Sequence, residues 1–500
     1  MLNLHEMKRV CIVGGGTAGW FAALYLRQIS SPNVEIMVIS APEIPIVGVG
    51  EGGVLNFIDA LIRLDIPLVE FLHATGAVHK LGFVYEGWRN GHQDSQDYYY
   101  HMFPKLNEQQ LWQVCGYYPI LSAMANHGIP VSYIVDSIKL RENNFSQDAL
   151  TQMLIAQENK SFASSFHFDT YKVGEYLKQV ALSRGVIHKE GLVKELIQDA
   201  ESGHVTEIRV DEENIPLDFL IDASGFARLA VGKTLNSQWQ SFADYLPMNT
   251  AIPFHLKHQQ KNPDLVTRST AMSSGWVWQI PLQERIGAGY VFNSDFLSPN
   301  QAVDEVEKWL GHSIEPIRTI RFEAGFYEKV WQKNVLAVGL ASGFVEPLEA
   351  TSIGQMLTQV STFADILTDC HGIVPQHVID KFNQQNAQSW YGIRDFIRLH
   401  YDTPRVDTPF WQSAAKLPMS STYQALKECW QQRTPREIDL TDYEMYKSAH
   451  FGVYSWFAIG QALGKISPEV TVPELLSLQP EQRQNLAKSL AEIKQRIGLA

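Results

Sequence analysis

Residues 8–30 read KRVCIVGGGTAGWFAALYLRQIS. The first apolar residues are typical of a buried strand, three glycines follow, and the remainder carries apolar residues at the spacing of a helix. A second apolar stretch, VEIMVIS, occupies residues 34–40. This order of strand, glycine turn, helix and strand predicts an α/β fold that begins with a Rossmann-like sheet.

The glycines of residues 14–19 have the spacing Gly-x-Gly-x-x-Gly. In this context they let the backbone approach a pyrophosphate at the N-terminus of a helix, so the motif predicts dinucleotide binding. An acidic residue that binds the ribose is expected at the end of the second strand, where this chain has Ser40. Glu35 and Glu43 are the nearest acidic residues, and the sequence leaves the ribose contact open.

Two later features bear on ligand binding, and a third concerns the fold of the C-terminal part. Two predicted strands are each followed by Ala-Ser-Gly-Phe, at residues 223–226 and 341–344, which favours two similar turns at one ligand over a chance repeat. The glycine-dense stretch IVGVGEGGVLNF at residues 46–57 is either a plain turn or a loop that lies against a ligand. After residue 354 most segments have helical periodicity.

Composition narrows the class of protein. The chain has 500 residues, 45% of them hydrophobic, and its 41 Lys and Arg against 54 Asp and Glu give a formal net charge of -13, which argues against nucleic-acid binding. The four cysteines are too far apart to imply a disulfide framework or a zinc site, so we expect no metal. No signal region and no membrane-length apolar run are evident, which predicts a cytoplasmic protein without membrane contact.

Residues 275–282 read GWVWQIPL. In an extended chain Trp276 and Trp278 point to one face, while Val277 and Gln279 point to the other. Such a pair is typical of a sheet that packs aromatic rings into the core. A pair of rings placed beside a ligand is the alternative, and the stretch alone does not decide between them.

Taken together, four stretches resemble the flavin-dependent halogenases of the tryptophan halogenase family. They are the glycine turn at residues 14–19, Lys80 in HKLGFVYEGW, the GWVWQIPL strand, and GLASGFVEPLEATSIG at residues 339–354. The resemblance extends over nearly the whole chain. It implies an α/β, FAD-binding, Rossmann-like flavin monooxygenase fold with a mixed-sheet substrate part and a helical C-terminal region.

The resemblance also implies a division of the chain. We expect an FAD-binding domain at residues 1–354, with substrate-facing insertions at about 76–165 and 236–330. A mostly helical region that caps the substrate is expected at residues 355–500.

The implied reaction uses FAD as FADH2, O2 and chloride or bromide to make hypohalous acid, which is delivered to Lys80 beside a small aromatic substrate. A separate flavin reductase would supply FADH2, and family resemblance suggests a homodimer. Lys80 lies in an apolar and aromatic context, where burial lowers the pKa of an ammonium group. It would act either as a neutral amine that captures halogen as a chloramine or as a donor that orients hypohalous acid, and both alternatives stay open.

The family's second catalytic residue matches Glu349, a carboxylate that would stabilise the cationic ring intermediate and help to remove its proton. The backbone amides of Thr351 and Ser352 would hold the halide. Ala350 departs from the family, whose members commonly carry serine after the catalytic glutamate. We interpret Glu346 as a loop or helix-capping charge.

Other positions are carried over from the family by their motifs. The expected flavin contacts are Gly14, Gly16, Thr17, Ala18, Gly19, Gly50, Glu51, Val193, Leu340 and Ile353. The expected substrate contacts are His101, Phe103 and Phe451. Trp276 and Trp278 are expected to form a barrier that keeps the substrate from the flavin while a small oxidant passes.

The substrate end of the chain differs from that of tryptophan-specific members. In DYEMYKSAHFGVYSW, residues 442–456, Tyr446 falls where those members carry a glutamate, so a substrate ammonium group would lose its carboxylate partner. We therefore expect free tryptophan to be a poor substrate, and indole, a substituted indole or a larger indole-containing molecule to be preferred. A flavin-dependent aromatic hydroxylase and a flavin-binding protein with a degenerate site are the alternative functions.

Overall fold

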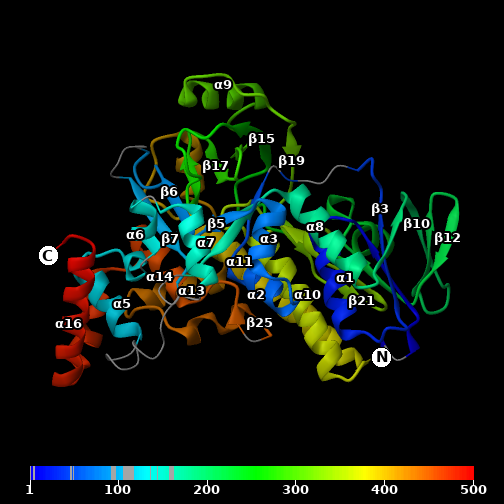
Figure 1. Ribbon diagram of the computed structural model, residues 1–500. Helices are drawn as coiled ribbons and strands as arrows, with labels where there is room; N and C mark the ends of the chain where they lie inside the picture. The colour runs from blue at the N-terminus through cyan, green and yellow to red at the C-terminus, as the bar shows by residue number, and fades with distance from the viewer. Residues whose placement is uncertain are drawn as a thin grey trace.

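A computed structural model of the chain describes residues 2–3, 6–44, 48, 50–91, 97–104, 117–135, 137–143, 145–156, 163–446 and 448–499. Its helices and sheets form a mixed α/β architecture (Figure 1). A Rossmann-like part lies at one end, a long sheet lies above the centre, and C-terminal helices lie at the other end.

The predicted Rossmann-like sheet is present, with six strands in the order β21-β22-β13-β2-β3-β9. The last five of these strands are parallel to their neighbours, and β21 pairs antiparallel with β22. Their bounds are β2 (Arg9–Val13), β3 (Glu35–Ser40), β9 (Ile187–Glu190), β13 (Phe219–Asp222), β21 (Trp331–Gln332) and β22 (Val335–Ala337). The strands that precede the two Ala-Ser-Gly-Phe sequences, β13 and β22, are direct neighbours, so both turns emerge at one edge of the sheet.

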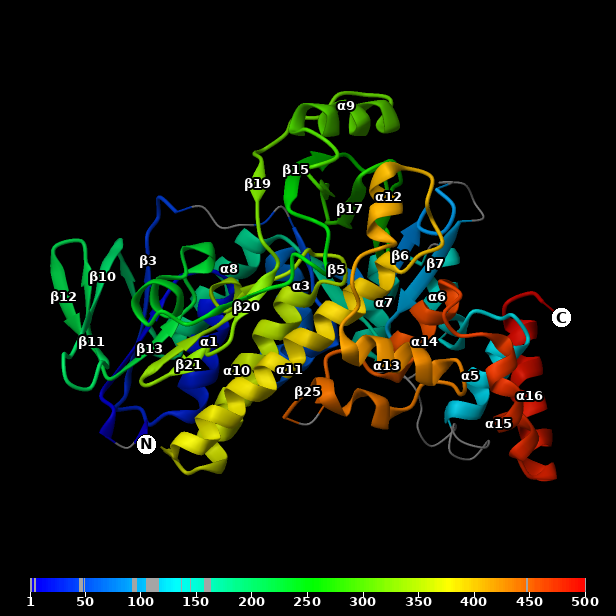
Figure 2. The ribbon, with the colours of Figure 1, turned by 180° about the vertical axis from the view of Figure 1, so that it is seen from behind.

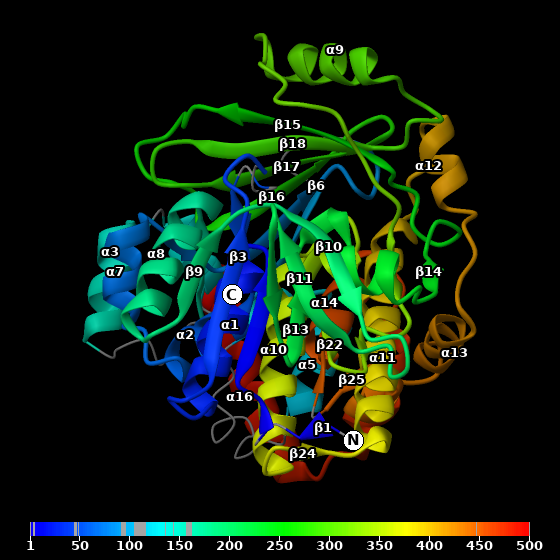
Figure 3. The same cartoon turned by 90° about the vertical axis from the view of Figure 1, so that its right-hand side faces the viewer.

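Different layers cover the two faces of this sheet (Figure 3). Helices α1 (Thr17–Ile29), α8 (Thr170–Ser183) and α10 (Thr351–Asp369) pack their apolar residues on one face. A three-stranded antiparallel sheet covers the other face. Its strands are β10 (Val193–Gln198), β11 (Val205–Val210) and β12 (Glu213–Pro216).

A second large sheet has seven strands in the order β19-β15-β18-β17-β16-β6-β7. It combines strands from both expected insertions: β6 (Gly82–Glu86), β7 (Tyr98–Met102), β15 (Thr250–Leu256), β16 (Val266–Ala271), β17 (Gly275–Pro281), β18 (Ile286–Phe292) and β19 (Ile320–Arg321). The expected alternation in β17 is confirmed, because Val277 packs toward α9 (Pro299–Leu310) whereas Trp276 and Trp278 pack toward the C-terminal helices.

The C-terminal part is mainly helical (Figure 2). Together with α5 (Tyr117–Asn126) and strands β6, β7 and β17, it encloses the largest apolar cluster of the described residues. Its helices are α11 (Gln376–Tyr401), α12 (Pro409–Ala414), α13 (Ser421–Trp430), α14 (Val453–Ala462), α15 (Val472–Ser477) and α16 (Pro480–Arg496). Short strands β24 (Ile373–Val374), β25 (Glu444–Met445) and β26 (Ser448–Ala449) interrupt them. No helix in the described part of the chain is long and apolar enough to cross a membrane.

A small three-stranded sheet joins the parts of the molecule that matter for the site. Its strands β4 (Glu51–Gly52), β8 (Ser165–Phe168) and β5 (Val78–Lys80) are antiparallel. The remaining helices and strands are β1 (Leu2–Asn3), α2 (Leu55–Arg63), α3 (Leu68–Thr75), α5 (Tyr117–Asn126), α6 (Ser137–Glu142), α7 (Gln147–Ile155), β14 (Trp239–Ser241), β20 (Gly325–Tyr327) and β23 (Gly343–Phe344).

Candidate active site

The glycine turn leaves backbone exposed at the position where a pyrophosphate is expected. A Cβ atom on Gly14 would lie 2.2 Å from the Ala223 carbonyl oxygen, and one on Gly19 would lie 1.9 Å from the Gly14 carbonyl oxygen, so both glycines are required for packing. A Cβ atom on Gly16 would meet nothing within 4 Å. Gly16 thus borders open space at the N-terminus of α1, as a dinucleotide-binding turn requires.

Neither acidic candidate for the ribose contact stands out. Glu35 forms an ion pair with Arg9. Glu43 is exposed. Ser40, at the position where the acidic residue is expected, hydrogen-bonds through Oγ to Nε2 of His188 at 2.9 Å. Glu35 is therefore already engaged, and the ribose contact stays open.

A cavity of about 620 Å³ brings together many of the expected flavin and halide residues. Its walls include Gly50, Glu51, Leu340, Ser352 and Ile353, and it extends to Trp278. Phe226 and Phe344, from the two Ala-Ser-Gly-Phe turns, also line it, with their ring centroids 5.1 Å apart.

Six expected flavin contacts lie outside the lining of this cavity, and three of them, Gly14, Gly16 and Gly19, belong to the glycine turn. Thr17 and Ala18 belong to the first turn of α1, and Gly339, beside Leu340, approaches the Cβ of Ala18. Val193 begins β10 and packs against the apolar cluster that contains Val13. The first turn of α1 therefore adjoins the cavity through Gly339 and Leu340.

Glu51 is an unusual group for a cavity wall. Burial raises the pKa of its carboxyl to about 7. A carboxyl group that exchanges a proton near neutral pH can donate or accept a hydrogen bond at a heterocyclic ligand.

The N-terminus of α10 faces this region without a capping side chain. Ala350 occupies the N-cap position with φ 54°, and the first turn of the helix has no acidic residue. The hydroxyl oxygens of Thr351 and Ser352 are buried and have no hydrogen-bond partner among the described residues. Free backbone amides together with unpartnered hydroxyl groups suit an anion such as a halide.

Lys80 is completely buried, and its amine has no hydrogen-bond partner in the described part of the chain. The Nζ atom lies 3.8 Å from the ring centroid of Phe83 and 5.5 Å from that of Phe103. Burial lowers the pKa of Lys80 to about 7, opposed in part by the charge of Glu349. Neutral and charged amine are therefore both accessible near neutral pH.

The side chain of Lys80 ends beside a glycine of the cavity wall. A Cβ atom on Gly52 would lie 2.8 Å from Lys80 Nζ and 3.1 Å from Cδ2 of His167. Gly52 and Phe83 both line the cavity, as does Thr267, whose hydroxyl lies 2.9 Å from His167 Nε2. The amine is therefore separated from the cavity only by a thin wall of small and aromatic residues.

Glu349 is held by two histidines from different elements. Nδ1 of His101, in β7, lies 2.9 Å from Oε2, and Nε2 of His400, in α11, lies 3.0 Å from Oε1. Burial by itself would raise the pKa of Glu349, but the charge and hydrogen bonds of His101 and His400 outweigh it and hold this pKa below its ordinary value. The carboxylate is therefore ionised and fixed in position.

Glu346 does not cap α10. It lies in a loop, as one alternative expected, but it is only 1% exposed and accepts a hydrogen bond of 2.6 Å from the hydroxyl of Tyr401. Burial raises the pKa of Glu346 to about 8, and the Tyr401 hydrogen bond partly opposes this. The pKa values of the two neighbouring glutamates are therefore shifted in opposite directions.

The tryptophan pair extends from the cavity wall into the core. The two indole centroids are 6.4 Å apart, Trp278 lines the cavity, and Trp276 is fully buried against Trp88. A Cβ atom on Gly289 would lie 2.1 Å from the Trp278 ring, so the indole lies directly across this glycine. Both alternatives considered for the pair are therefore present: Trp276 packs in the core, and Trp278 lies beside the cavity.

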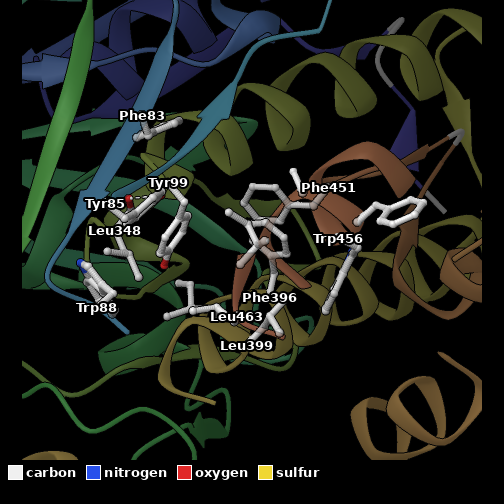
Figure 4. Packing of buried hydrophobic residues seen from close by; sticks show 14 of the residues in the cluster. Phe83, Tyr85, Trp88, Tyr99, Leu348, Phe396, Leu399, Phe451, Trp456 and Leu463 are labelled. Atoms are coloured by element: carbon white, nitrogen blue, oxygen red, sulfur yellow. Dashed lines mark hydrogen bonds between the residues drawn. The ribbon is translucent and has the colours of Figure 1, made fainter. Parts of the chain in front are cut away.

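Two expected substrate residues, Phe103 and Phe451, belong to one cluster of buried apolar side chains, in which Figure 4 shows Phe451 beside Phe396. The third, His101, contacts Glu349. Phe451 stacks on Phe396 with ring centroids 3.8 Å apart, and its ring lies 6.3 Å from that of His101. Phe103 packs edge-on against Phe83. Tyr446, at the position of the missing glutamate, donates a hydrogen bond to Asp369 at 2.7 Å and is not part of this cluster.

Two residues of the site had no signal in the sequence. His400 in α11 and His167 in β8 belong to no recognised motif and are remote along the chain from Glu349 and Lys80. Only the packing of α11 and β8 brings them to the site. Among the described residues, no group of three or more His, Cys, Asp or Glu could hold a metal ion.

The fold and the open glycine turn define the class of dinucleotide-binding proteins with a Rossmann-like sheet. Residues 9–477 match the family described as tryptophan halogenase, and the chain belongs to this family.

Individual relatives agree with this assignment. The uncharacterized protein y4xG of Sinorhizobium fredii is 38% identical, with 100% of this chain and 98% of that protein covered. The tryptophan 6-halogenase ThaL of Streptomyces albogriseolus is 28% identical, with 98% and 96% covered. The solved structure of BrvH, a flavin-dependent halogenase from Brevundimonas sp. BAL3, has a TM-score of 0.80 at 27% identity, with 99% and 96% covered.

The protein is thus an enzyme, an oxidoreductase of the flavin-dependent halogenase type, and the expected α/β fold class is confirmed. Membership of this family implies a flavin cofactor used with halide and O2, an aromatic substrate and a separate flavin reductase.

Proposed function

We propose that the enzyme halogenates a neutral, indole-type aromatic substrate, using FADH2, O2 and chloride or bromide, with Lys80 and Glu349 as catalytic residues. The observation that carries this proposal is the buried, unpartnered amine of Lys80 beside the wall of the cavity. When bound, the reduced flavin would supply, with O2 and halide, the hypohalous acid.

The cavity and the glycine turn support the placement of the cofactor. Gly14, Gly16, Thr17, Ala18 and Gly19 would receive the pyrophosphate end, where the backbone at Gly16 borders open space. The heterocyclic end would lie against the cavity residues Gly50, Glu51, Leu340 and Ile353, and Val193 would contact the part of the nucleotide nearest β10. The amides of Thr351 and Ser352 would hold the halide at the N-terminus of α10.

Lys80 would receive hypohalous acid at the thin wall near Gly52. As an ammonium it would donate a hydrogen bond to the oxygen and orient the halogen, and as an amine it would capture the halogen as a chloramine. Both forms are populated near the pKa of about 7. The halogen passes to a ring carbon, the ring proton leaves, and this proton and the hydroxide from hypohalous acid combine as water.

Glu349 would stabilise the positive charge on the ring and accept its proton, since the two histidines keep the carboxylate ionised. Proton transfer of this kind contributes about 10²- to 10⁴-fold in rate. His101, Phe103 and Phe451 would supply the faces against which the aromatic ring packs. Trp278 at the cavity wall and Trp276 behind it would block the larger substrate from the flavin.

The departure from the family at Tyr446 supports a substrate other than free tryptophan. Its hydroxyl is bonded to Asp369, and it offers no carboxylate to a substrate ammonium group. Without such a partner, a site loses its discrimination in favour of the charged amino acid. Indole, a substituted indole or a larger indole-containing molecule therefore fits better than free tryptophan.

The test supplies the enzyme with FAD, a generic flavin reductase, NADH and O2, and offers indole or tryptophan with chloride or bromide separately. We expect a halogenated indole by mass spectrometry, which is lost in Lys80→Ala while flavin binding is retained. Efficient, saturable turnover of tryptophan would reject the substrate proposal. An oxygenated product without halide would favour an aromatic hydroxylase, and flavin binding without turnover of any aromatic compound would favour a degenerate site.

A further inference from the structure

His400 lies in the last turn of α11 and is completely buried. Its Nε2 atom lies 3.0 Å from Oε1 of Glu349, and its Nδ1 atom lies 3.3 Å from the hydroxyl of Tyr99. The imidazole thus bridges a catalytic candidate and a tyrosine of the second sheet. The family motifs from which the site was predicted do not include this histidine.

Aromatic rings fix the orientation of the His400 imidazole. The ring centroid of Tyr85 lies 4.7 Å away, that of Phe396 5.5 Å and that of Trp88 5.9 Å. Because aromatic rings enclose the imidazole in this way, it has little freedom to turn its nitrogen away from Glu349.

The hydrogen bonds also fix which nitrogen carries the proton. The hydroxyl of Tyr99 can donate to Nδ1 of His400, which leaves Nε2–H to donate to Glu349. On the other side, the hydroxyl of Ser455 lies 2.9 Å from Nε2 of His101, so it can donate there while Nδ1–H of His101 donates to Glu349. The two histidines can therefore each direct an N–H donor at the carboxylate.

We propose that His400 is a positioning residue that, together with His101, holds the Glu349 carboxylate ionised and in one orientation, with Tyr99 setting the tautomer of His400. This inference rests on the proposed role of Glu349 as the group that accepts the ring proton. A carboxylate without the His400 donor would share the single Nδ1 donor of His101, which lies 2.9 Å from Oε2 and 3.1 Å from Oε1. With one histidine donor in place of two, burial favours the protonated, inactive form of Glu349 more strongly.

Other titratable groups also face this pair, and they bear on any pH profile. Glu349 interacts electrostatically with a set of groups on several elements, namely Lys80, Tyr85, Tyr99, His101 and His450. Burial lowers the pKa of His400, opposed in part by Glu349, and lowers the pKa of His450 to about 4. Because the pKa of Lys80 is about 7, a change in the acid limb on mutation of His400 is assigned to Glu349 only where a direct signal of the Glu349 carboxyl changes with it.

The experiment compares His400→Leu with His400→Gln in the flavin-loaded enzyme. Leucine removes the donor, whereas the amide nitrogen of glutamine can replace Nε2–H. We expect His400→Leu to lower kcat about 100-fold with KM changed little, and to move the acid limb of the kcat profile to higher pH. His400→Gln is expected to restore most of kcat and the position of this limb.

Equal impairment of both variants, or a His400→Leu enzyme with the kcat and acid limb of the wild type, would overturn the inference. A second measurement does not need halogenation. Infrared difference spectra against Glu349→Gln report the protonated carboxyl band of Glu349, which is expected at neutral pH in His400→Leu and not in wild type or His400→Gln. If His400→Leu shows no protonated carboxyl band, the inference fails. If the three proteins show the expected bands but the wild-type enzyme halogenates nothing, only the proposed function is contradicted.

Discussion

Gly52 is where the lack of a side chain has its clearest effect on the chemistry. Its missing Cβ leaves room for the amine of Lys80 beside the cavity wall. Gly52→Ala would place a methyl group 2.8 Å from Nζ, and because this is the end of a flexible side chain the lysine shifts while the fold persists. We expect at least about tenfold less halogenated product for each flavin oxidised, with flavin affinity unchanged.

Gly16→Ala is the matched control for this prediction. The methyl group would enter open space in the protein alone, so stability is retained, but it would occupy the approach to the pyrophosphate. Flavin titration should therefore show weaker binding for Gly16→Ala only, and the ratio of product to oxidised flavin should fall for Gly52→Ala only. An unchanged product ratio in Gly52→Ala would contradict a passage at this wall.

Among the site residues, the sequence predicted those that belong to a short local motif. Lys80 and Glu349 were found because short patterns mark them, and their burial agrees with the expected chemistry. His400 could not be found in this way. It lies 51 residues from Glu349 along the chain, and no local pattern in α11 specifies the partner of this histidine.

Among the elements, α10 carries the proposed halide site at its N-terminus. Ala350 adopts a left-handed conformation at the N-cap, which asparagine and aspartate tolerate better than most residues. Ala350→Asp adds a negative charge beside the proposed anion, whereas Ala350→Asn has nearly the same shape without the charge. We expect Ala350→Asp to raise the KM for bromide and chloride about tenfold or more, because a carboxylate beside the first turn of α10 repels a halide bound there.

The halide dependence of product formation, measured at saturating indole, checks this prediction. Ala350→Asn should stay within about threefold of the wild-type KM if the charge is responsible. Equal KM values for the two variants would place the halide elsewhere. The protein's thermal stability should be measured for both, so that a local change of the helix start is recognised.

At the element scale, the sequence predicted local structure better than pairing. The strand-turn-helix start and the alternation of β17 follow from short periodic patterns, and both are confirmed. The pairing of β6 with β16, which joins segments about 180 residues apart, has no counterpart in any local pattern. Such pairings depend on packing of the complete chain, and they are what brings His101 to Glu349.

For the whole molecule, burial of the Lys80 amine lowers the free energy of unfolding. The pKa of this group falls from 10.5 in an unfolded chain to about 7 in the folded protein. Below pH 7 the folded protein must therefore bury a charged ammonium, at a cost on the order of 5 kcal/mol, which is an upper estimate. Between about pH 7 and 10.5 the folded amine is neutral and the unfolded one still charged, so the cost declines and disappears as pH rises.

Lys80→Met fills a similar volume without a charge. In the flavin-free protein we expect this variant to unfold at a higher temperature than wild type near pH 6.5, and the difference to shrink steadily toward pH 10. Thermal unfolding at a fixed scan rate measures it, with Lys172→Met as the control, since that half-exposed surface lysine should change little at any pH. A stabilisation that is absent at pH 6.5, or that grows with pH, would show that burial does not lower the pKa of Lys80. The lysine would then lack the neutral amine near pH 7 on which part of its proposed chemistry depends.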